Sequence, residues 1–237
     1  MKKNMQLSVL MHLRYICMAF IIAFGFITLI ATGGCGGGGG TPAPGPGVTT
    51  VSGTAAAGLP IVGTINIRGS NGSISSSAIE SDGSFSVDIL ALTAPFVMWA
   101  EGMSGGKFVR LYSCIAGGGI ANVTPATNMI MAMALGDDPA TVYADGSTAG
   151  APDFGAIETA KQQIAVRLES VFANMNMPED FDLMNGSFEA NGEGFDALLD
   201  TVDMTYDATD KKVAIKDKVT DTTLFEKEVD TGITSVD

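Results

Sequence analysis

Histidine is almost absent from this sequence of 237 residues, in which His12 is the only one. His12 lies in an N-terminal segment that we expect to be removed. The remaining chain then has no histidine to serve as the base of a Ser-His-Asp or Cys-His relay. It also lacks the side chain that most often binds zinc and other transition metals. The sequence therefore predicts neither kind of site in the mature chain.

Cysteine is scarce as well, with only Cys17, Cys35 and Cys114. We expect Cys17 to leave with the N-terminal segment and Cys35 to be modified, so no disulfide can form within the mature chain. Cys114 alternates with Phe108 and Tyr112 on one face of an expected strand. This position predicts a buried thiol, because a reactive one needs basic neighbours and Arg110 alone is a weak case.

Basic residues are few. The sequence has 13 lysines and arginines against 26 acidic residues, and three of the basic ones precede Cys35 while no acidic one does. The chain from Cys35 onward therefore carries 10 basic and 26 acidic residues, a net charge of about −16. Nucleic acids and anionic lipid surfaces select basic patches, so neither is expected as a partner. Solubility is the ordinary reason for such a surface.

The one long hydrophobic run lies near the start, from Tyr15 to Ala31. Lys2, Lys3 and Arg14 precede it, and small residues follow it. A basic start, an apolar run and a small-residue site are typical of a secretory signal peptide, which we assign to residues 1–34. A retained membrane-spanning helix is the alternative, since the run is only slightly shorter than the roughly 20 residues that cross a bilayer.

Thr32, Gly33 and Gly34 lead directly into Cys35. This junction resembles the lipobox of bacterial lipoproteins, although Thr32 stands where leucine is usual. The resemblance implies that the thiol of Cys35 carries a lipid with fatty acids such as palmitate. Residues 35–47, rich in glycine and proline, then form a tether without a core. Gly36 is not the aspartate that retains such lipoproteins at the inner membrane, so the resemblance implies an outer-membrane lipoprotein, periplasmic or surface-exposed.

The remaining pattern predicts an α+β protein in two parts. Over residues 48–123, short apolar alternations separated by glycine, serine, asparagine and aspartate predict a small β-sandwich. Ile65 and Ile67 share one face of a strand, and Phe85, Val87 and Ile89 share a face of another. The turn from Ser81 to Ser84 opens the second of these strands.

Three motifs in this part occur in a known order. They are Val51-Ser-Gly-Thr54, Gly58-Leu-Pro-Ile-Val-Gly-Thr-Ile-Asn-Ile67, and Ser81-Asp-Gly-Ser-Phe-Ser-Val87. Together they resemble a carboxypeptidase regulatory-like domain over roughly residues 48–101. The resemblance implies a prealbumin-like β-sandwich used as a spacer or binding module, with no catalytic residues.

Residues 124–237 have a helical period and a short β tail. Thr124-Pro125 predicts a capped helix that ends at Gly136, Asp138-Pro139 a short turn of helix, and Asp153 the cap of the longest helix. A further short helix is expected from Phe195. Alternation from Met204 onward, clearest at Val213 and Ile215, predicts two or three strands. The connection at residues 117–119 is too short to separate the two parts, so we expect them to pack together.

Three groups of residues are candidate sites. Met129, Met131 and Met133 offer soft ligands for copper, but their spacing favours a place in the core. The acidic stretch after Glu179 fails the EF-hand pattern, so we expect no metal site and no cofactor there. Its weak candidates for calcium are Asp180, Asp182, Asn185 and Glu189.

Carboxylate pairs of a glycosidase could come from Asp196 with Asp200, or Glu189 with Glu193. Acids four apart on a helix are common on solvated faces, and the only tryptophan, Trp99, lies inside an expected strand rather than on a sugar-binding platform. We therefore expect a non-enzymatic, lipid-anchored envelope protein that acts as a binding or structural module, with an envelope protein or polysaccharide as its partner. An accessory subunit of a larger envelope complex and an exported acid-pair hydrolase are the alternatives.

Overall fold

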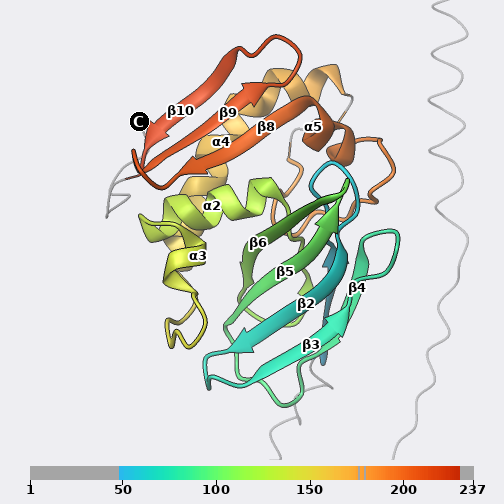
Figure 1. The fold of residues 1–237 in the computed structure, drawn as a ribbon, viewed down its shortest axis with the longest axis vertical. Coiled ribbons are helices and arrows are strands. Elements are labelled where there is room, and N and C mark those ends of the chain that lie inside the picture. The colour runs from blue at the N-terminus through green and yellow to red at the C-terminus, as the bar shows by residue number, and fades with distance from the viewer. Residues whose placement is uncertain (1–47, 176, 179, 230–237) are drawn as a thin grey trace, which may run out of the picture. The chain divides into compact units, whose positions relative to one another are not determined.

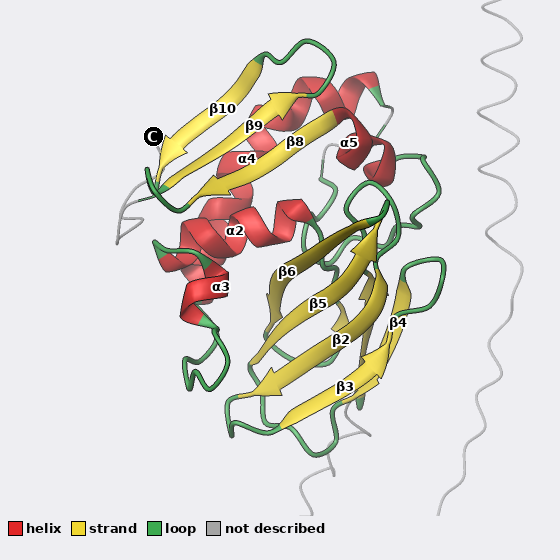
Figure 2. Ribbon diagram, in the orientation of Figure 1, coloured by secondary structure: helices red, strands yellow, loops and turns green. Residues whose placement is uncertain are grey.

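The chain is an α+β protein in a computed structural model that describes residues 48–229 except 176 and 179. Ten strands and four helices make up the described part (Figure 1), with most strands before the helices and three after them (Figure 2). The strands are β1 (Thr50–Thr54), β2 (Val62–Gly69), β3 (Ile74–Ala78), β4 (Ser84–Asp88), β5 (Phe96–Ser104), β6 (Lys107–Ile115), β7 (Gly119–Ile120), β8 (Val202–Asp207), β9 (Lys212–Asp217) and β10 (Thr223–Glu228). The helices are α2 (Pro125–Leu135), α3 (Pro139–Val142), α4 (Phe154–Asn174) and α5 (Phe195–Thr201).

Two sheets form the strand-rich region before residue 124. One has the order β4-β1-β7 and the other β3-β2-β5-β6. Alternation sends one row of side chains from each sheet into a shared core, because successive residues of a strand face opposite ways. Phe85 and Val87 enter this core from the first sheet, and Ile65, Ile67 and Met98 enter it from the second.

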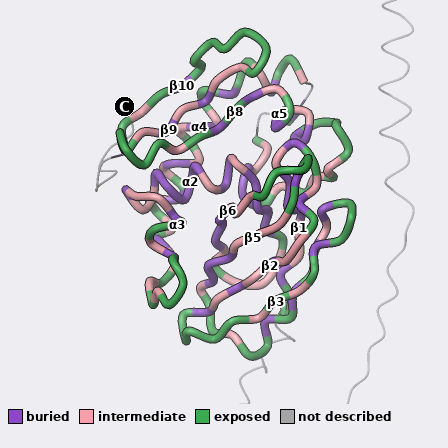
Figure 3. The backbone as a smooth tube through the Cα atoms, viewed as in Figure 1, coloured by how far each residue is buried: buried purple, intermediate pink, exposed green. Residues whose placement is uncertain are grey.

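Helix α2 is enclosed on nearly all sides. Thr124 caps it through a reciprocal pair of hydrogen bonds with Thr127, and Gly136 ends it in the left-handed conformation that glycine adopts readily. The three methionines of the helix are buried, so their predicted place in the core is confirmed. Figure 3 shows most of this helix in the colour of buried residues. It packs against β6, α4 and β8.

Helix α4 begins after Asp153, whose carboxylate accepts a hydrogen bond from the backbone N–H of Ala156 at 2.9 Å. Ile157, Ile164 and Leu168 form its buried stripe at helical spacing. The last three strands form a separate sheet of order β10-β9-β8. Val213 and Ile215 of β9 are fully buried in the core that α4 also enters, as their alternation predicts.

One hydrophobic core joins the strand-rich and helical regions. The side chains of Val97, Tyr112 and Cys114 leave the outer face of β5 and β6 and enter the same cluster as α2 and α4. The two regions therefore pack together, as the short glycine connection predicts. Phe108, which the alternation places on the same strand face as Tyr112 and Cys114, does not share this contact. It lies beside the turn between β5 and β6, opposite Met103, and is 68% exposed.

Several sequence-based assignments lie outside the described residues. They are the signal peptide, the lipid on Cys35 and the tether up to residue 47. Within the described residues, none of the helices combines the length and the apolar character that crossing a bilayer requires.

Candidate functional site

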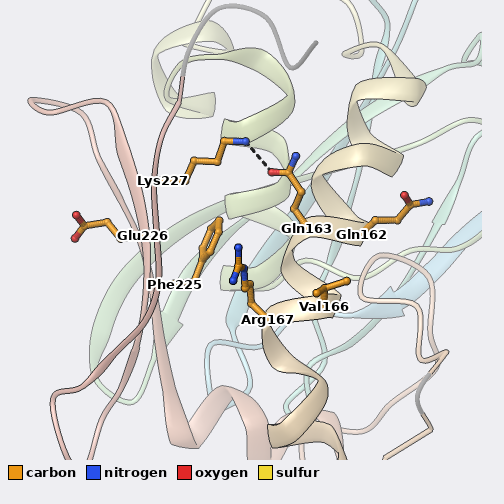
Figure 4. Close-up of a pocket in the computed structure, with 7 residues that line it drawn as sticks. All are labelled: Gln162, Gln163, Val166, Arg167, Phe225, Glu226 and Lys227. Carbon is orange, nitrogen blue, oxygen red and sulfur yellow. Dashed lines mark hydrogen bonds between the residues drawn. The ribbon is translucent and has the colours of Figure 1, made fainter. Parts of the chain in front are cut away.

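A groove of about 540 Å³ lies between α4 and β10. Gln162 and Gln163 lie on one side of α4 with Val166 and Arg167, because residues four apart in a helix are neighbours on its surface. Phe225, Glu226 and Lys227 of β10 form the opposite wall (Figure 4). The site thus combines residues that are about 60 positions apart in the sequence.

Hydrogen-bond donors dominate this groove. The Arg167 guanidinium lies over the Phe225 ring, 5.9 Å from its centroid, where the π-electrons attract a cation. The Lys227 ammonium donates to Gln163 Oε1 at 3.0 Å. Gln163 Nε2 is enclosed and has no acceptor among the described residues. The Arg167 and Lys227 cations can bind a carboxylate or a row of carbonyl oxygens.

The groove reaches the edge of β10. Phe225 and Lys227 point to one face of the strand and Glu226 to the other, as Figure 4 shows. All three residues line the groove, so the groove runs along β10, the edge strand of its sheet. The Glu226 carboxylate does not cancel the groove's positive charge, because it pairs with the Lys212 ammonium at 2.9 Å.

A second cavity, of about 410 Å³, lies beside the glycine connection after β6. The Lys161 ammonium enters it but pairs with Glu158 at 2.7 Å and Asp182 at 2.9 Å, so its charge is neutralised. Cys114 also contributes to the wall, and burial raises the pKa of this thiol to about 12. The thiol therefore stays protonated near neutral pH, which makes it a poor nucleophile.

The weak calcium candidates are committed to other contacts or lie apart. Asp182 Oδ1 accepts hydrogen bonds from the backbone N–H groups of Met184 and Asn185 at 2.8 and 3.0 Å. Its Oδ2 accepts a hydrogen bond from the Lys161 ammonium. Asp180 and Glu189 are exposed. Among residues 48–229, apart from 176 and 179, no three acidic, histidine or cysteine side chains gather with the geometry of a metal site.

Replacement of Asp182 by asparagine is expected to lower the free energy of unfolding by about 1 kcal/mol at pH 7, since partial exposure screens its ion pair. Burial raises the pKa of Asp182, but the hydrogen bond from Lys161 and those from the backbone outweigh it and lower the pKa. The contribution is thus complete above the unfolded pKa of about 4 and is lost as the pH falls below it. Urea unfolding at pH 7 and pH 3 measures this difference.

Asp180→Asn is the matched control for that experiment, because Asp180 is an exposed acid two residues away. It should change stability little at either pH. Equal losses for the two variants would show that the ion pair with Lys161 contributes nothing.

The two proposed carboxylate pairs have different surroundings. Glu189 and Glu193 lie in the loop before α5, where both line a third cavity with Phe181, Phe188 and Phe195. Asp200 is exposed, as predicted for an acid on a solvated helix face. The same prediction is wrong for Asp196, which is 1% exposed.

Asp196 is enclosed in a polar turn rather than presented to a substrate. Its Oδ2 accepts the backbone N–H of Gly192 at 2.7 Å, and its Oδ1 has no partner in the described part of the chain. Burial raises the pKa of this carboxyl group. Asp196 lines none of the three cavities described above, so it is poorly placed to protonate a glycosidic bond.

Sequence reasoning missed the groove. No motif marks it, and its cations are single residues on a helix and a strand. The only available signal was the row Gln163 and Arg167, four residues apart on the long helix. Comparison of this chain with protein-family models, with curated proteins and with solved structures gave no match.

Proposed function

We propose that this chain is a lipid-anchored, non-catalytic binding module of the bacterial cell envelope. The observation that carries the binding role is the groove between α4 and β10. It combines the Arg167 and Lys227 cations with the apolar side chains of Val166 and Phe225 and lies along the edge strand of a sheet. Such a surface can hold a partner without any nucleophile or acid-base pair. The anchoring role rests on the small residues before Cys35 and the glycine-rich tether after it.

The strand-rich region fits the spacer role that the resemblance to a carboxypeptidase regulatory-like domain implies. Two features support this proposal. Val51-Ser-Gly-Thr54 lies in a strand between two neighbours, and the turn at Asp82-Gly83 opens the next strand of the same sheet. The glycine of the first motif, Gly53, has a physical reason, because a Cβ there would lie 1.9 Å from the carbonyl oxygen of Ala121.

The location that best fits these features is the outer membrane, with the folded part in the periplasm or at the cell surface. Gly36, directly after the proposed lipidated cysteine, supports it. In this proposal the contact with the membrane passes through the lipid rather than through a basic surface.

Cells that produce the chain in the presence of radioactive palmitate are expected to label the wild type and not the Cys35→Ala variant. The reason is that the thiol of Cys35 is the proposed acceptor of the diacylglyceryl group. Cys114→Ala is the control and should label like the wild type, because Cys114 is buried. Equal labelling of Cys35→Ala and wild type contradicts the anchoring proposal.

One observation favours the accessory-subunit alternative. Val62 of β2 lies opposite Met103 of β5, and Met103 lies opposite Phe108 of β6, beside the turn between β5 and β6. These three residues are 47–68% exposed. Adjacent apolar side chains of this kind are typical of protein interfaces. The size of the detergent-solubilised protein separates the two functions, since a subunit belongs to a larger particle.

A further inference from the structure

We infer that the groove between α4 and β10 binds an extended, acidic polypeptide segment, which adds to the edge of β10 as a further strand. The inference deepens the proposed binding function by naming the chemistry of the partner. It concerns the groove alone and does not depend on the lipid anchor.

The first argument is the open edge. Strand β10 is the end member of the sheet β10-β9-β8 and pairs only with β9 among the described residues. In an antiparallel pair, every second residue directs both its N–H and its C=O away from the partner strand. From Phe225 to Glu228, beyond the register shift between Thr223 and Phe225, these groups form a row of donors and acceptors that another polypeptide backbone matches.

The second argument is the position of the groove along that edge. Three consecutive residues of β10, Phe225, Glu226 and Lys227, line the groove, so a chain lying in it would run along this edge strand. Helix α4 forms the other wall and gives the incoming strand an apolar contact at Val166, which is 67% exposed. A strand placed there would cover Val166 and the rim of Phe225.

The third argument is charge. The chain has twice as many acidic as basic residues, yet Arg167 and Lys227 meet in this groove and neither has a carboxylate partner within residues 48–229, leaving out 176 and 179. The nearest acid along β10, Glu226, is paired with Lys212. A segment with acidic side chains would supply the missing carboxylates, and a basic segment would be repelled.

The experiment measures binding of the full-length chain in detergent to fluorescein-labelled peptides by anisotropy at low salt. The probe is a nine-residue peptide of alternating glutamate and valine, and lysine replaces glutamate in its counterpart. We expect the acidic peptide to bind and the basic one not to bind. Arg167→Ala combined with Lys227→Ala should weaken binding about tenfold or more, because both cations are lost. Raising the salt concentration should also weaken it.

Lys107→Ala is the matched control, since Lys107 is an exposed lysine at the start of β6, outside the groove. It should leave the affinity within about twofold, because a distant exposed charge is screened. Thermal melts of both variants verify that they are folded. Equal affinity of the acidic and basic peptides, or no loss in the double variant, overturns the inference.

Backbone pairing is tested by peptides that are N-methylated at every second residue, in the two possible alternations. Only one alternation places its N–H groups toward β10, so we expect one methylated peptide to lose binding and the other to keep it. Equal binding of the two would show attraction by charge without strand addition. Polygalacturonate that displaces the peptide as well as the unlabelled peptide does, or a dimer formed through β10, would also overturn the inference.

The two proposals fail in different ways. Loss of peptide binding with normal lipid labelling at Cys35 removes the inference and leaves the anchored protein. Absence of labelling with normal peptide binding removes the anchor and leaves the acidic-peptide site.

Discussion

Replacement of Gly53 by alanine is expected to destabilise the chain by roughly 3 kcal/mol or more, or to prevent folding. The Cβ atom would lie 1.9 Å from the carbonyl oxygen of Ala121 and 2.7 Å from its carbonyl carbon. Both contacts are with backbone, which cannot rotate away as a side chain can. Strand β1 and the segment that follows β7 would have to separate.

That separation would cost specific hydrogen bonds. The backbone N–H of Ala121 donates to Ser52 at 2.9 Å, and the N–H of Val123 donates to Thr54 at 3.0 Å. The buried amide of Asn122 accepts from the N–H of Thr54 at 3.2 Å and donates to the carbonyl of Gly186. The loop before α5 would thus lose part of its support. Buried polar groups left without partners each cost about 1–3 kcal/mol.

Urea unfolding followed by circular dichroism measures the effect, with Gly117→Ala as the control. A Cβ at Gly117 meets no atom within 4 Å, so this variant should stay within about 0.5 kcal/mol of the wild type. A Gly53→Ala protein as stable as the wild type would show that β1 has room to move.

Cys114 is expected to react with a thiol reagent at pH 8 about a thousandfold more slowly in the folded chain than in urea. The thiolate is the reactive form, and a pKa raised by burial to about 12 leaves almost none of it, whereas an unfolded cysteine has a pKa of about 8.5. Mass spectrometry of the tryptic peptide from Leu111 to Lys161 reports this cysteine separately from the other two.

The same burial makes stability depend on pH. Because the pKa is higher in the folded chain, the contribution of Cys114 is complete below about pH 8.5 and is lost as the pH rises toward 12. Cys114→Ala removes that part of the slope. Equal labelling rates in folded and unfolded chains would mean that the core between β6 and α2 opens readily.

Local signals allowed the helical region to be predicted. Thr124, Asp138 and Asp153 each accept a hydrogen bond from a backbone N–H of the first helical turn. The donor lies only two or three residues further along the chain, so a short stretch of sequence predicts the cap. Strand β3 has no such signal. Its residues, Ile74–Ala78, are mostly serine and largely exposed, and their pairing with β2 defines the strand.

The parts that could not be predicted depend on contacts between distant segments. The Asp182 carboxylate pairs with Lys161, which is 21 residues away. The amide of Asn122 donates to the carbonyl of Gly186, which is 64 residues away. Asp196 was assigned to a solvated face because its spacing from Asp200 is helical, and only the turn at Gly192 shows that it is enclosed. The groove exists only because β10 lies beside α4, and no local sequence pattern predicts that arrangement.

The core shared by β6, α2 and β9 has a consequence for the order in which the chain can fold. If the chain is exported as proposed, its N-terminal strands leave the membrane first, so Tyr112 and Cys114 have no cover until α2 has followed them, and Val213 completes the cluster about 100 residues later. Until then an apolar sheet face is open to other unfolded chains, and such faces aggregate. We therefore expect chaperone contacts after export to concentrate on residues 96–135, and to end when β9 and β10 have emerged.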